Sequence, residues 1–337
     1  MANKNTNLHN AKQVKDDEFY TTYESIEKEM SHYLKHFENK TVLCNCDDPL
    51  ESNFCKYFIV NFNELKLKRL ICTSYGPSKV SMTKYKNLSF KKSKSKGYKL
   101  DISFSIYDMN NKKSIEEIIV QNQLIVRLNG NGDFRSEECV ELLKISDIVV
   151  TNPPFSLFKE IVSLVLNHKK EFLFIGSQNA LLYKEIFPLI QRGEIWTGFQ
   201  FGEMKFRVPK SSTPRSTRYW VDEEGNKWRS LGNAMWLTNI DNELRHKEIK
   251  FKRVYNPIDY PKYDNFDAIN VKTINDIPDN YYGIMGVPIT FINRFNRDQF
   301  EIVGEANHGS DNEFDLFKPT INGKEIYKRI LIRRVKK

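Results

Sequence analysis

Short apolar runs alternate with longer amphipathic stretches through the first two thirds of the chain. Apolar runs of four to eight residues bounded by turn residues are typical of buried strands, and the longer periodic stretches are typical of covering helices. The pattern therefore predicts an α/β fold built on a mostly parallel sheet. The predicted strands are Thr41–Cys44, Arg69–Thr73, Leu124–Leu128, Asp147–Thr151, Phe172–Ser177, Ile195–Phe201 and Ala234–Asn239. The predicted helices are Ser52–Leu65, Glu137–Lys144, Ser156–Asn167 and Asn179–Arg192.

Two polar stretches interrupt this alternation. Lys79–Lys99 is rich in Lys and Ser and too polar for a core, so we interpret it as a basic inserted loop. Lys205–Ser230 separates the last two predicted strands and mixes basic with aromatic residues. Such a mixture suits a nucleic-acid surface, although a solvated loop with a small hydrophobic cluster explains it almost as well. Beyond Asn256 no clear period continues, so we predict a catalytic domain over residues 1–255 and a smaller C-terminal lobe over 256–337.

Charge indicates the kind of partner. The 337 residues include 52 Lys and Arg against 43 Asp and Glu, a formal charge of +9, and 40% are hydrophobic, which is enough for a sizeable core. A basic surface attracts phosphates and releases their counterions, so the excess favours a polyanionic partner. A general codon bias toward Lys is the alternative.

Cysteine usage and the N-terminus indicate the compartment. The five cysteines lack the paired spacing of a zinc site, and no metal is implied. The first 17 residues have no apolar core like that of a signal peptide, and no later run approaches the roughly 18 apolar residues of a membrane span. We therefore expect a cytoplasmic protein with reduced thiols.

The segment that can carry chemistry is Asn152-Pro153-Pro154-Phe155, which follows a predicted buried strand. Two prolines remove two backbone donors and fix φ, so the loop is stiff at the carboxyl edge of the sheet, where ligands of doubly wound folds bind. The Asn152 side-chain oxygen and the Pro153 carbonyl are two acceptors suited to the hydrogens of a planar amino group. Phe155 offers a ring on which a base can stack. The alternative is a proline-stiffened turn without chemistry.

Several motifs in a fixed order identify a family resemblance. They are Glu18-Phe19-Tyr20, Asn45-Cys46-Asp47-Asp48-Pro49, Gly132-Asp133-Phe134-Arg135-Ser136, Asn152–Phe155, Tyr263–Val271 and Met285–Phe291. Together they resemble the EcoRI-type adenine-specific DNA methyltransferase family over nearly the whole chain. The resemblance implies a Rossmann-like core with a seven-stranded, mostly parallel sheet, S-adenosylmethionine as methyl donor, and methylation of adenine N6 in double-stranded DNA. It further implies a flipped target adenine, action as a monomer, and the role of modification enzyme in a restriction-modification system, in which any cognate endonuclease would act separately.

The resemblance also implies roles for individual residues in the cofactor pocket. The turn formed by Asn45, Cys46, Asp47 and Asp48 is expected to pass under the methionine part of the cofactor, with Asn152 nearby. Asp133 is expected to accept a hydrogen bond from the amino group of the cofactor's adenine, while Phe134 packs on the ring of that adenine. Tyr20 is expected to close the pocket from the other side.

Two features depart from the wider methyltransferase pattern. The first turn, Cys44–Pro49, contains no glycine, so close backbone approach to a cofactor needs another solution. The acidic residue expected after the second strand is absent from Cys72–Tyr75, and Asp47 or Asp48 is the candidate substitute for holding the ribose.

We assign the DNA-facing surface to the polar stretch between the last two predicted strands. Phe206 is a candidate second wall for the extruded base, and anchoring of this stretch to the core is the equal alternative. The basic residues expected to contact phosphates are Lys205, Arg207, Lys210, Arg215 and Arg218.

Other signals are weaker. His32 and His36 lie four residues apart as zinc ligands can, but no glutamate base accompanies them and an exposed helix face is favoured. Asn129–Gly132 lacks the third glycine and the Lys of nucleotide-binding loops, so we interpret it as a turn that presents Asp133. Competing functions are methylation of RNA adenine or a protein glutamine amide, and DNA binding by a non-catalytic methyltransferase fold.

Overall fold

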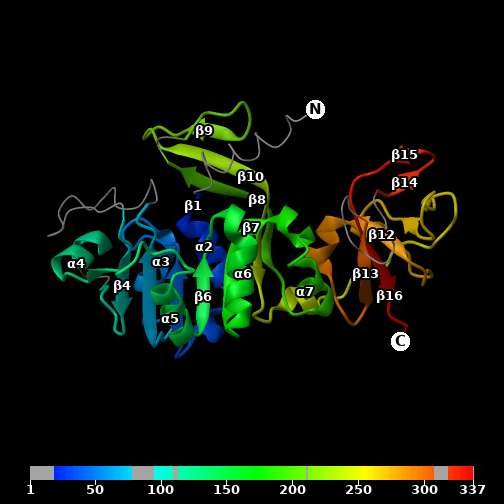
Figure 1. Cartoon of the computed structure of the whole chain (residues 1–337). Coiled ribbons are helices and arrows are strands. Elements are labelled where there is room, and N and C mark those ends of the chain that lie inside the picture. The colour runs from blue at the N-terminus through cyan, green and yellow to red at the C-terminus, as the bar shows by residue number, and fades with distance from the viewer. Residues whose placement is uncertain (1–18, 78–94, 109–112, 210–211, 307–317, 337) are drawn as a thin grey trace. The chain divides into compact units, whose positions relative to one another are not determined.

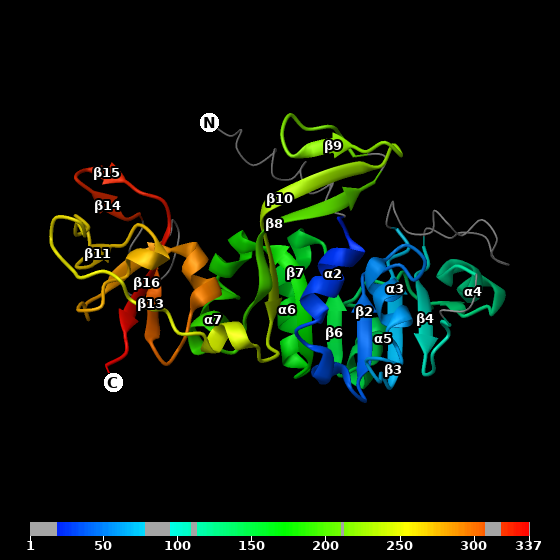
Figure 2. The same ribbon diagram turned by 180° about the vertical axis from the view of Figure 1, so that it is seen from behind.

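The computed structural model describes residues 19–77, 95–108, 113–209, 212–306 and 318–336 (Figures 1 and 2). Most of the predicted insert Lys79–Lys99 and the predicted DNA contact Lys210 lie outside these residues. The chain divides into two compact units, one formed by residues 1–177 and 202–236 and the other by residues 178–201 and 237–337. This division differs from the predicted boundary after residue 255, because each of two long strands begins in one unit and ends in the other.

The first unit is organised around a mixed sheet. The sheet has ten strands in the order β1-β8-β10-β7-β6-β2-β3-β4-β5, with β9 paired to β10. Its parallel centre consists of β2 (Thr41–Asn45), β3 (Arg69–Ser74), β6 (Ile148–Thr151) and β7 (Glu171–Ser177). The remaining strands are β1 (Tyr20–Thr21), β4 (Tyr98–Ile102), β5 (Ile125–Arg127), β8 (Trp196–Val208), β9 (Tyr219–Val221) and β10 (Lys227–Thr238).

The chain reverses its strand order between β2 and β6. From β2 the next strand, β3, lies on one side, whereas β6 pairs with the other edge of β2 and leads outward to β7. In open α/β sheets ligands bind beyond the carboxyl ends of the strands at such a switch point. The turn after β2 and the loop after β6 therefore meet where a site is expected.

Helices cover both faces of the parallel centre, with α5 and α6 in front in Figure 1 and α2 and α3 in front in Figure 2. The Ser52 side chain caps α3 by accepting from Phe54 N, and Ser136 caps α5 by accepting from Cys139 N. The helices of this unit are α2 (Tyr23–Met30), α3 (Asn53–Val60), α4 (Ile115–Gln121), α5 (Glu137–Ile145) and α6 (Phe158–Asn167), with 3-10 turns η1 (Leu34–Phe37) and η3 (Phe155–Leu157).

The α/β class is confirmed, but the expected sheet of seven mostly parallel strands is not, because the described sheet has ten strands and is antiparallel outside its centre. Three further details differ from the sequence prediction. Strand β4 was not predicted, and it makes the sheet antiparallel beyond β3. The stretch Lys205–Ser230 is not a simple loop, since β8 continues to Val208 and β9 pairs with the start of β10. The predicted helix Asn179–Arg192 is divided into η4 (Gln178–Leu182) and α7 (Phe187–Arg192), with Pro188 at the start of α7, where its missing N–H costs nothing.

The second unit contains a smaller sheet in the order β11-β12-β16-β13. Helix α7 packs on this sheet, and Gln191 Nε2 donates to Ile302 O at 3.0 Å. Its elements are β11 (Ile269–Asn270), β12 (Met285–Pro288), β13 (Phe300–Ala306), β14 (Thr320–Ile321), β15 (Lys324–Glu325) and β16 (Arg329–Arg334), with 3-10 turns η5 (Glu243–His246), η6 (Ile274–Asp276) and η7 (Ile289–Arg294).

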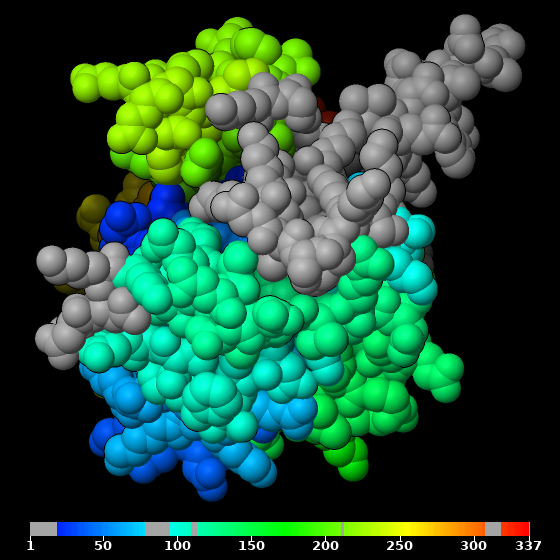
Figure 3. All heavy atoms as spheres, turned by 90° about the vertical axis from the view of Figure 1, so that its left-hand side faces the viewer, coloured from blue at the N-terminus to red at the C-terminus, as the bar shows by residue number. Residues whose placement is uncertain are grey.

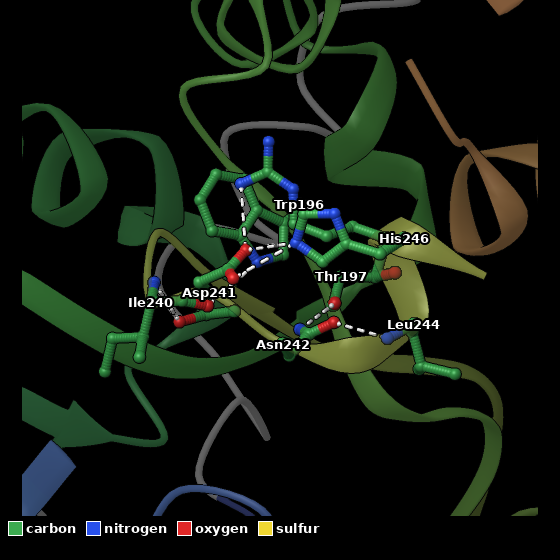
Figure 4. Close-up of polar contacts among 9 residues, drawn as sticks. Trp196, Thr197, Ile240, Asp241, Asn242, Leu244 and His246 are labelled. Atoms are coloured by element: carbon green, nitrogen blue, oxygen red, sulfur yellow. Dashed lines mark hydrogen bonds and ion pairs between the residues drawn. The ribbon is translucent and has the colours of Figure 1, made fainter. Parts of the chain in front are cut away.

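Polar contacts connect the start of β8 to the segment after β10 within this unit (Figure 4). Trp196 Nε1 donates to Ile240 O at 2.9 Å, and Asn242 Nδ2 donates to Thr197 O at 3.1 Å. His246 Nε2 lies 2.9 Å from Asp241 Oδ1. A hydrogen bond also joins residues on the two sides of the predicted boundary after residue 255, since Asn296 Nδ2 donates to His246 O at 3.0 Å. Within the described ranges, no helix is both long enough and apolar enough to span a bilayer.

Candidate active site

The Asn152–Phe155 loop leaves the carboxyl end of β6 at the switch point of the sheet. Pro153 is buried, Pro154 precedes η3, and Phe155 begins that turn. The prolines end the strand as predicted because neither can donate a ladder hydrogen bond. The loop therefore projects from a rigid buried strand.

Strand β1 and the residue before it fix the amide group of Asn152. Asn152 Nδ2 donates to the Phe19 carbonyl at 2.7 Å and to Thr21 Oγ1 at 3.2 Å. Both amide hydrogens are therefore used, one by Phe19 just before β1 and one by Thr21 on β1. The acceptor Oδ1 has no hydrogen-bond partner within the described parts of the chain.

Aromatic rings surround the loop. The Phe19 ring lies 5.5 Å from Phe155 and 5.4 Å from Phe206 between centroids, and the Arg229 guanidinium lies over the Phe19 ring at 5.3 Å. Phe155 is half-buried, whereas Phe206 has no exposed surface. In this structure Phe206 therefore offers no face to a base, and its burial fits the alternative that it anchors β8 to the core.

The turn after β2 achieves without glycine a conformation that usually needs it. Cys46 has φ 72°, in the left-handed region that glycine enters most easily. The missing glycine of the sequence pattern is thus replaced by a cysteine that adopts a similar backbone conformation.

Asp47 lies inside the protein and links this turn to β6. Its Oδ1 accepts from Ser52 Oγ at 2.7 Å, and its Oδ2 lies 2.5 Å from Thr151 Oγ1. The Thr151 hydroxyl also contacts the Asn45 carbonyl. One hydroxyl proton cannot serve two acceptors, so a proton on Asp47 satisfies both contacts. Burial raises the pKa of Asp47 well above its usual value, in agreement with a neutral carboxyl group.

The neighbouring candidates have different environments. Asp48 Oδ1 accepts from the backbone N–H groups of Leu50 and Glu51 at 3.0 and 3.2 Å, as in a turn. Tyr20 is half-buried on β1, where it pairs with Arg207. The positions of both residues near the switch point keep them as candidates for a pocket wall.

The predicted turn that presents Asp133 is present beside the end of β3. Gly132 has φ 80°, and a Cβ there would come within 2.1 Å of the Ser74 carbonyl, so only glycine fits. Asp133 forms a bidentate ion pair with Arg135, at 2.9 Å to Nε and 2.7 Å to Nη2, which holds the pKa of its carboxyl group below the usual value. Phe134 is buried. Asp133 is therefore an ionised hydrogen-bond acceptor, and Arg135 already donates to both of its oxygens.

Unsatisfied polar atoms lie at the ends of β2 and β3. Asn45 Oδ1, Thr73 Oγ1 and Ser74 Oγ are buried without a hydrogen-bond partner within the described residues. Buried polar groups without partners are rare in folded proteins, so these strand ends fit contact with a polar ligand. Thr73 and Ser74 occupy the place where the sequence lacks the expected acidic residue.

The predicted basic residues that the structure describes lie on an arm formed by β8, β9 and β10. Lys205 and Arg207 are exposed on β8 and alternate with the buried Met204 and Phe206. Arg215 and Arg218 are exposed in the connection to β9. In Figure 3 the yellow-green residues of this segment form the upper part of the face. No group of three potential metal-ligating side chains occurs in the part of the chain that the structure covers.

Sequence reasoning missed the contributions of Phe19 and Thr21. Their contacts with Asn152 span more than 130 positions of sequence, and no local pattern reports such a contact. The only signal in the sequence was their position beside Tyr20 in a family motif.

A stiff Asn-Pro-Pro-Phe loop at the switch point of an open α/β sheet, with the amide fixed from one side, defines the class of methyltransferases that act on amino groups. The family model of the adenine-specific methyltransferase EcoRI matches residues 7–335, and the chain belongs to this family. It is 45% identical to the Type II methyltransferase M.EcoRI of Escherichia coli, over 99% of this chain and 98% of that protein.

Two further relatives come from mycoplasmas. Type II methyltransferase M.MgeORF184P of Mycoplasma genitalium is 32% identical over 97% of this chain and 98% of its own length. Type II methyltransferase M.MpnI of Mycoplasma pneumoniae is 36% identical over 88% of this chain and 84% of its own length. The family resemblance expected from the motifs is thereby confirmed, and the protein is an adenine-specific methyltransferase.

Proposed function

We propose that the protein transfers a methyl group from S-adenosylmethionine to N6 of an adenine in duplex DNA, as the modification enzyme of a Type II restriction-modification system. The observation that carries the proposal is the Asn152 amide, whose hydrogens are bound by Phe19 and Thr21 and whose oxygen has no partner among the residues that the structure describes. The names of the relatives and the basic arm support duplex DNA as the substrate.

The chemical task of the loop follows from the nucleophile. The lone pair of an adenine amino group is delocalised into the ring, so it attacks poorly. Asn152 Oδ1 and the Pro153 carbonyl accept the two amino hydrogens and favour a pyramidal nitrogen, acting as fixed dipoles where charge develops. Phe155 stacks on the base and holds it for in-line attack.

The residues around the strand ends suit the methyl donor. S-adenosylmethionine supplies an activated methyl group on sulfur. The proposed pocket for S-adenosylmethionine is lined by Asn45, Cys46, Asp48, Tyr20 and Phe134. Asp133 accepts a hydrogen bond from the amino group of the cofactor's adenine ring. Asp47 supports the turn from inside, because both of its oxygens already have protein partners. The unsatisfied Thr73 and Ser74 hydroxyls are suited to the ribose.

The decisive experiment incubates the purified protein with S-adenosylmethionine carrying a labelled methyl group and with unmethylated duplex DNA. We expect label in N6-methyladenine, and sequencing of DNA from expressing cells should locate the modified site. Label on RNA or on a protein amide in place of DNA would favour those substrates. DNA binding without transfer would favour the non-catalytic alternative.

The catalytic role of Asn152 has its own prediction. Asn152→Ala removes one of two acceptors and leaves the cofactor turn intact, so turnover should fall by roughly 10²–10³, as for the loss of one preorganised oxyanion donor. Calorimetry should find the affinity for S-adenosylmethionine nearly unchanged. Near-normal turnover of the variant would remove Asn152 from the mechanism.

We further propose that the enzyme acts as a monomer and that any cognate endonuclease binds DNA independently of it. Analytical ultracentrifugation with and without DNA tests the first point.

A further inference from the structure

The Asn152 side chain can serve as an acceptor in only one of its two orientations. The NH₂ and C=O groups of an amide have nearly the same shape, and rotation by 180° exchanges a double donor for an acceptor. An NH₂ group directed at adenine would face another NH₂ group and form no hydrogen bond. Methyl transfer through Asn152 therefore requires a device that selects the orientation.

The Phe19 carbonyl, just before β1, selects the orientation, and the Thr21 hydroxyl on β1 adds a second contact that holds the selected amide in place. The Phe19 carbonyl accepts from Nδ2 at 2.7 Å and Thr21 Oγ1 accepts at 3.2 Å. A carbonyl oxygen can only accept, so the reversed amide would set two acceptors against each other at Phe19.

Three other elements fix β1 itself. Its backbone pairs with β8, with Thr21 opposite Phe206. Asn53 Nδ2, at the start of α3, donates to the Thr21 carbonyl at 2.7 Å. Thr22, the next residue, caps α2 by accepting from Ser25 N at 3.2 Å. Thr21 is only 4% exposed, so its hydroxyl has little freedom to move.

We propose that Thr21 is a positioning residue for methyl transfer: its hydroxyl, together with the Phe19 carbonyl, holds the Asn152 amide so that Oδ1 faces the target amino group. The inference rests on the proposed role of Asn152 and adds a residue that does not touch the substrate. Its effect is on the rate of the chemical step and not on the affinity for either substrate.

Two substitutions of Thr21 separate this role from packing. Thr21→Val keeps the shape of the side chain and removes the acceptor, whereas Thr21→Ser keeps the hydroxyl and removes a methyl group. If the hydrogen bond matters, the Val variant is slow and the Ser variant is close to wild type. If packing alone matters, the order is reversed.

The measurement is the single-turnover rate of methyl transfer to a plasmid carrying the mapped site, at saturating S-adenosylmethionine. We expect Thr21→Val to be about threefold to tenfold slower, the effect of one net hydrogen bond. Dissociation constants for S-adenosylmethionine and for DNA, and the melting temperature, should stay within about twofold and about two degrees of wild type. A normal rate for Thr21→Val, or equal slowing of both variants, would overturn the proposal.

Asn152→Ala, measured in parallel, separates this inference from the proposed function. If Asn152→Ala keeps its turnover, the proposed mechanism fails and Thr21 has nothing to position. If Asn152→Ala loses turnover and Thr21→Val does not, only the positioning role fails.

Discussion

Asp47 lies inside the protein beside the proposed site, and both of its carboxyl oxygens have protein partners. Its carboxyl group receives a hydrogen bond from Ser52 and lies 2.5 Å from the Thr151 hydroxyl, which also contacts the Asn45 carbonyl. Because burial raises its pKa, the folded protein keeps a proton there at pH values at which the unfolded chain, with a pKa near 4, has released it. Folding then binds a proton, so this group makes stability fall as the pH rises above about 4.

Asp47→Asn should therefore remove this pH dependence. The Asn amide donates to Thr151 and accepts from Ser52, which reproduces the neutral acid. We expect the difference in melting temperature, variant minus wild type, to increase as the pH is raised from 5 to 8. The affinity for S-adenosylmethionine should be retained. Asp47→Ala, which loses both hydrogen bonds, is the control and should be destabilised at every pH. A folded Asn variant with much weaker cofactor binding would indicate that a charged Asp47 contacts the cofactor.

Asp133 is the opposite case, an ionised carboxylate at the surface of the proposed pocket. Asp133→Ala should weaken S-adenosylmethionine binding more than DNA binding, because it removes the acceptor for the adenine amino group. Arg135→Ala is the matched control, since it breaks the same ion pair and leaves the carboxylate. If calorimetry finds equal losses for both variants, the ion pair and not the acceptor matters, and the assignment of this turn is wrong.

Among the elements, the basic arm was the hardest to predict. Lys205, Phe206, Arg207 and Val208 alternate between exposed and buried, which is the period of a strand. The sequence nevertheless indicated a loop, because the polar face dominates the composition of the stretch. The buried central strands and the Asn-Pro-Pro-Phe loop were predicted well, since their apolar runs and prolines act locally. Strand β4 was missed although Tyr98, Leu100 and Ile102 alternate with polar residues as in a half-buried strand, because its first residues were assigned to the polar insert Lys79–Lys99.

The strand geometry sharpens the prediction for DNA binding. Lys205 and Arg207 lie on the same face of β8, so one duplex backbone can contact both. Replacing Lys205 or Arg207 by Ala should weaken DNA binding by a similar factor whatever the DNA sequence. The slope of log affinity against log salt should decrease by about one for each phosphate that the variant no longer neutralises.

Glu203→Gln is the control on the same exposed side of β8. It removes a negative charge and should leave binding unchanged or strengthen it. If the salt dependence of DNA affinity is unchanged in the Lys205, Arg207, Arg215 and Arg218 variants, the DNA-binding surface lies elsewhere. The Lys79–Lys99 stretch is then the first candidate.

At the scale of the whole molecule, the chain is organised by long strands that no boundary in the sequence marks. β8 enters the first unit at residue 202 and β10 leaves it at residue 236. A change in composition near residue 256 indicated a lobe, but residues 178–201 and 237–255 pack with that lobe through contacts such as that between Gln191 and Ile302. Such contacts join distant segments, and local periodicity carries no information about them.

At the same scale, the proposed mechanism requires that the target base leave the duplex. The acceptors of a loop that projects from a buried strand cannot reach an amino group that is stacked and paired in a duplex, so the adenine must leave the helix at a cost of a few kcal/mol. Phe155 can offset part of this cost by stacking, and Phe19, in contact with Phe155 and Phe206, is the neighbour that the sequence did not reveal.

With 2-aminopurine at the mapped adenine, emission should rise when the wild-type protein binds, and Phe155→Ala should reduce the rise or slow methylation. The same probe at an adenine outside the site is the control and should show no rise. Normal methylation of the natural site without any rise at the target would count heavily against extrusion into a pocket that contains Phe155.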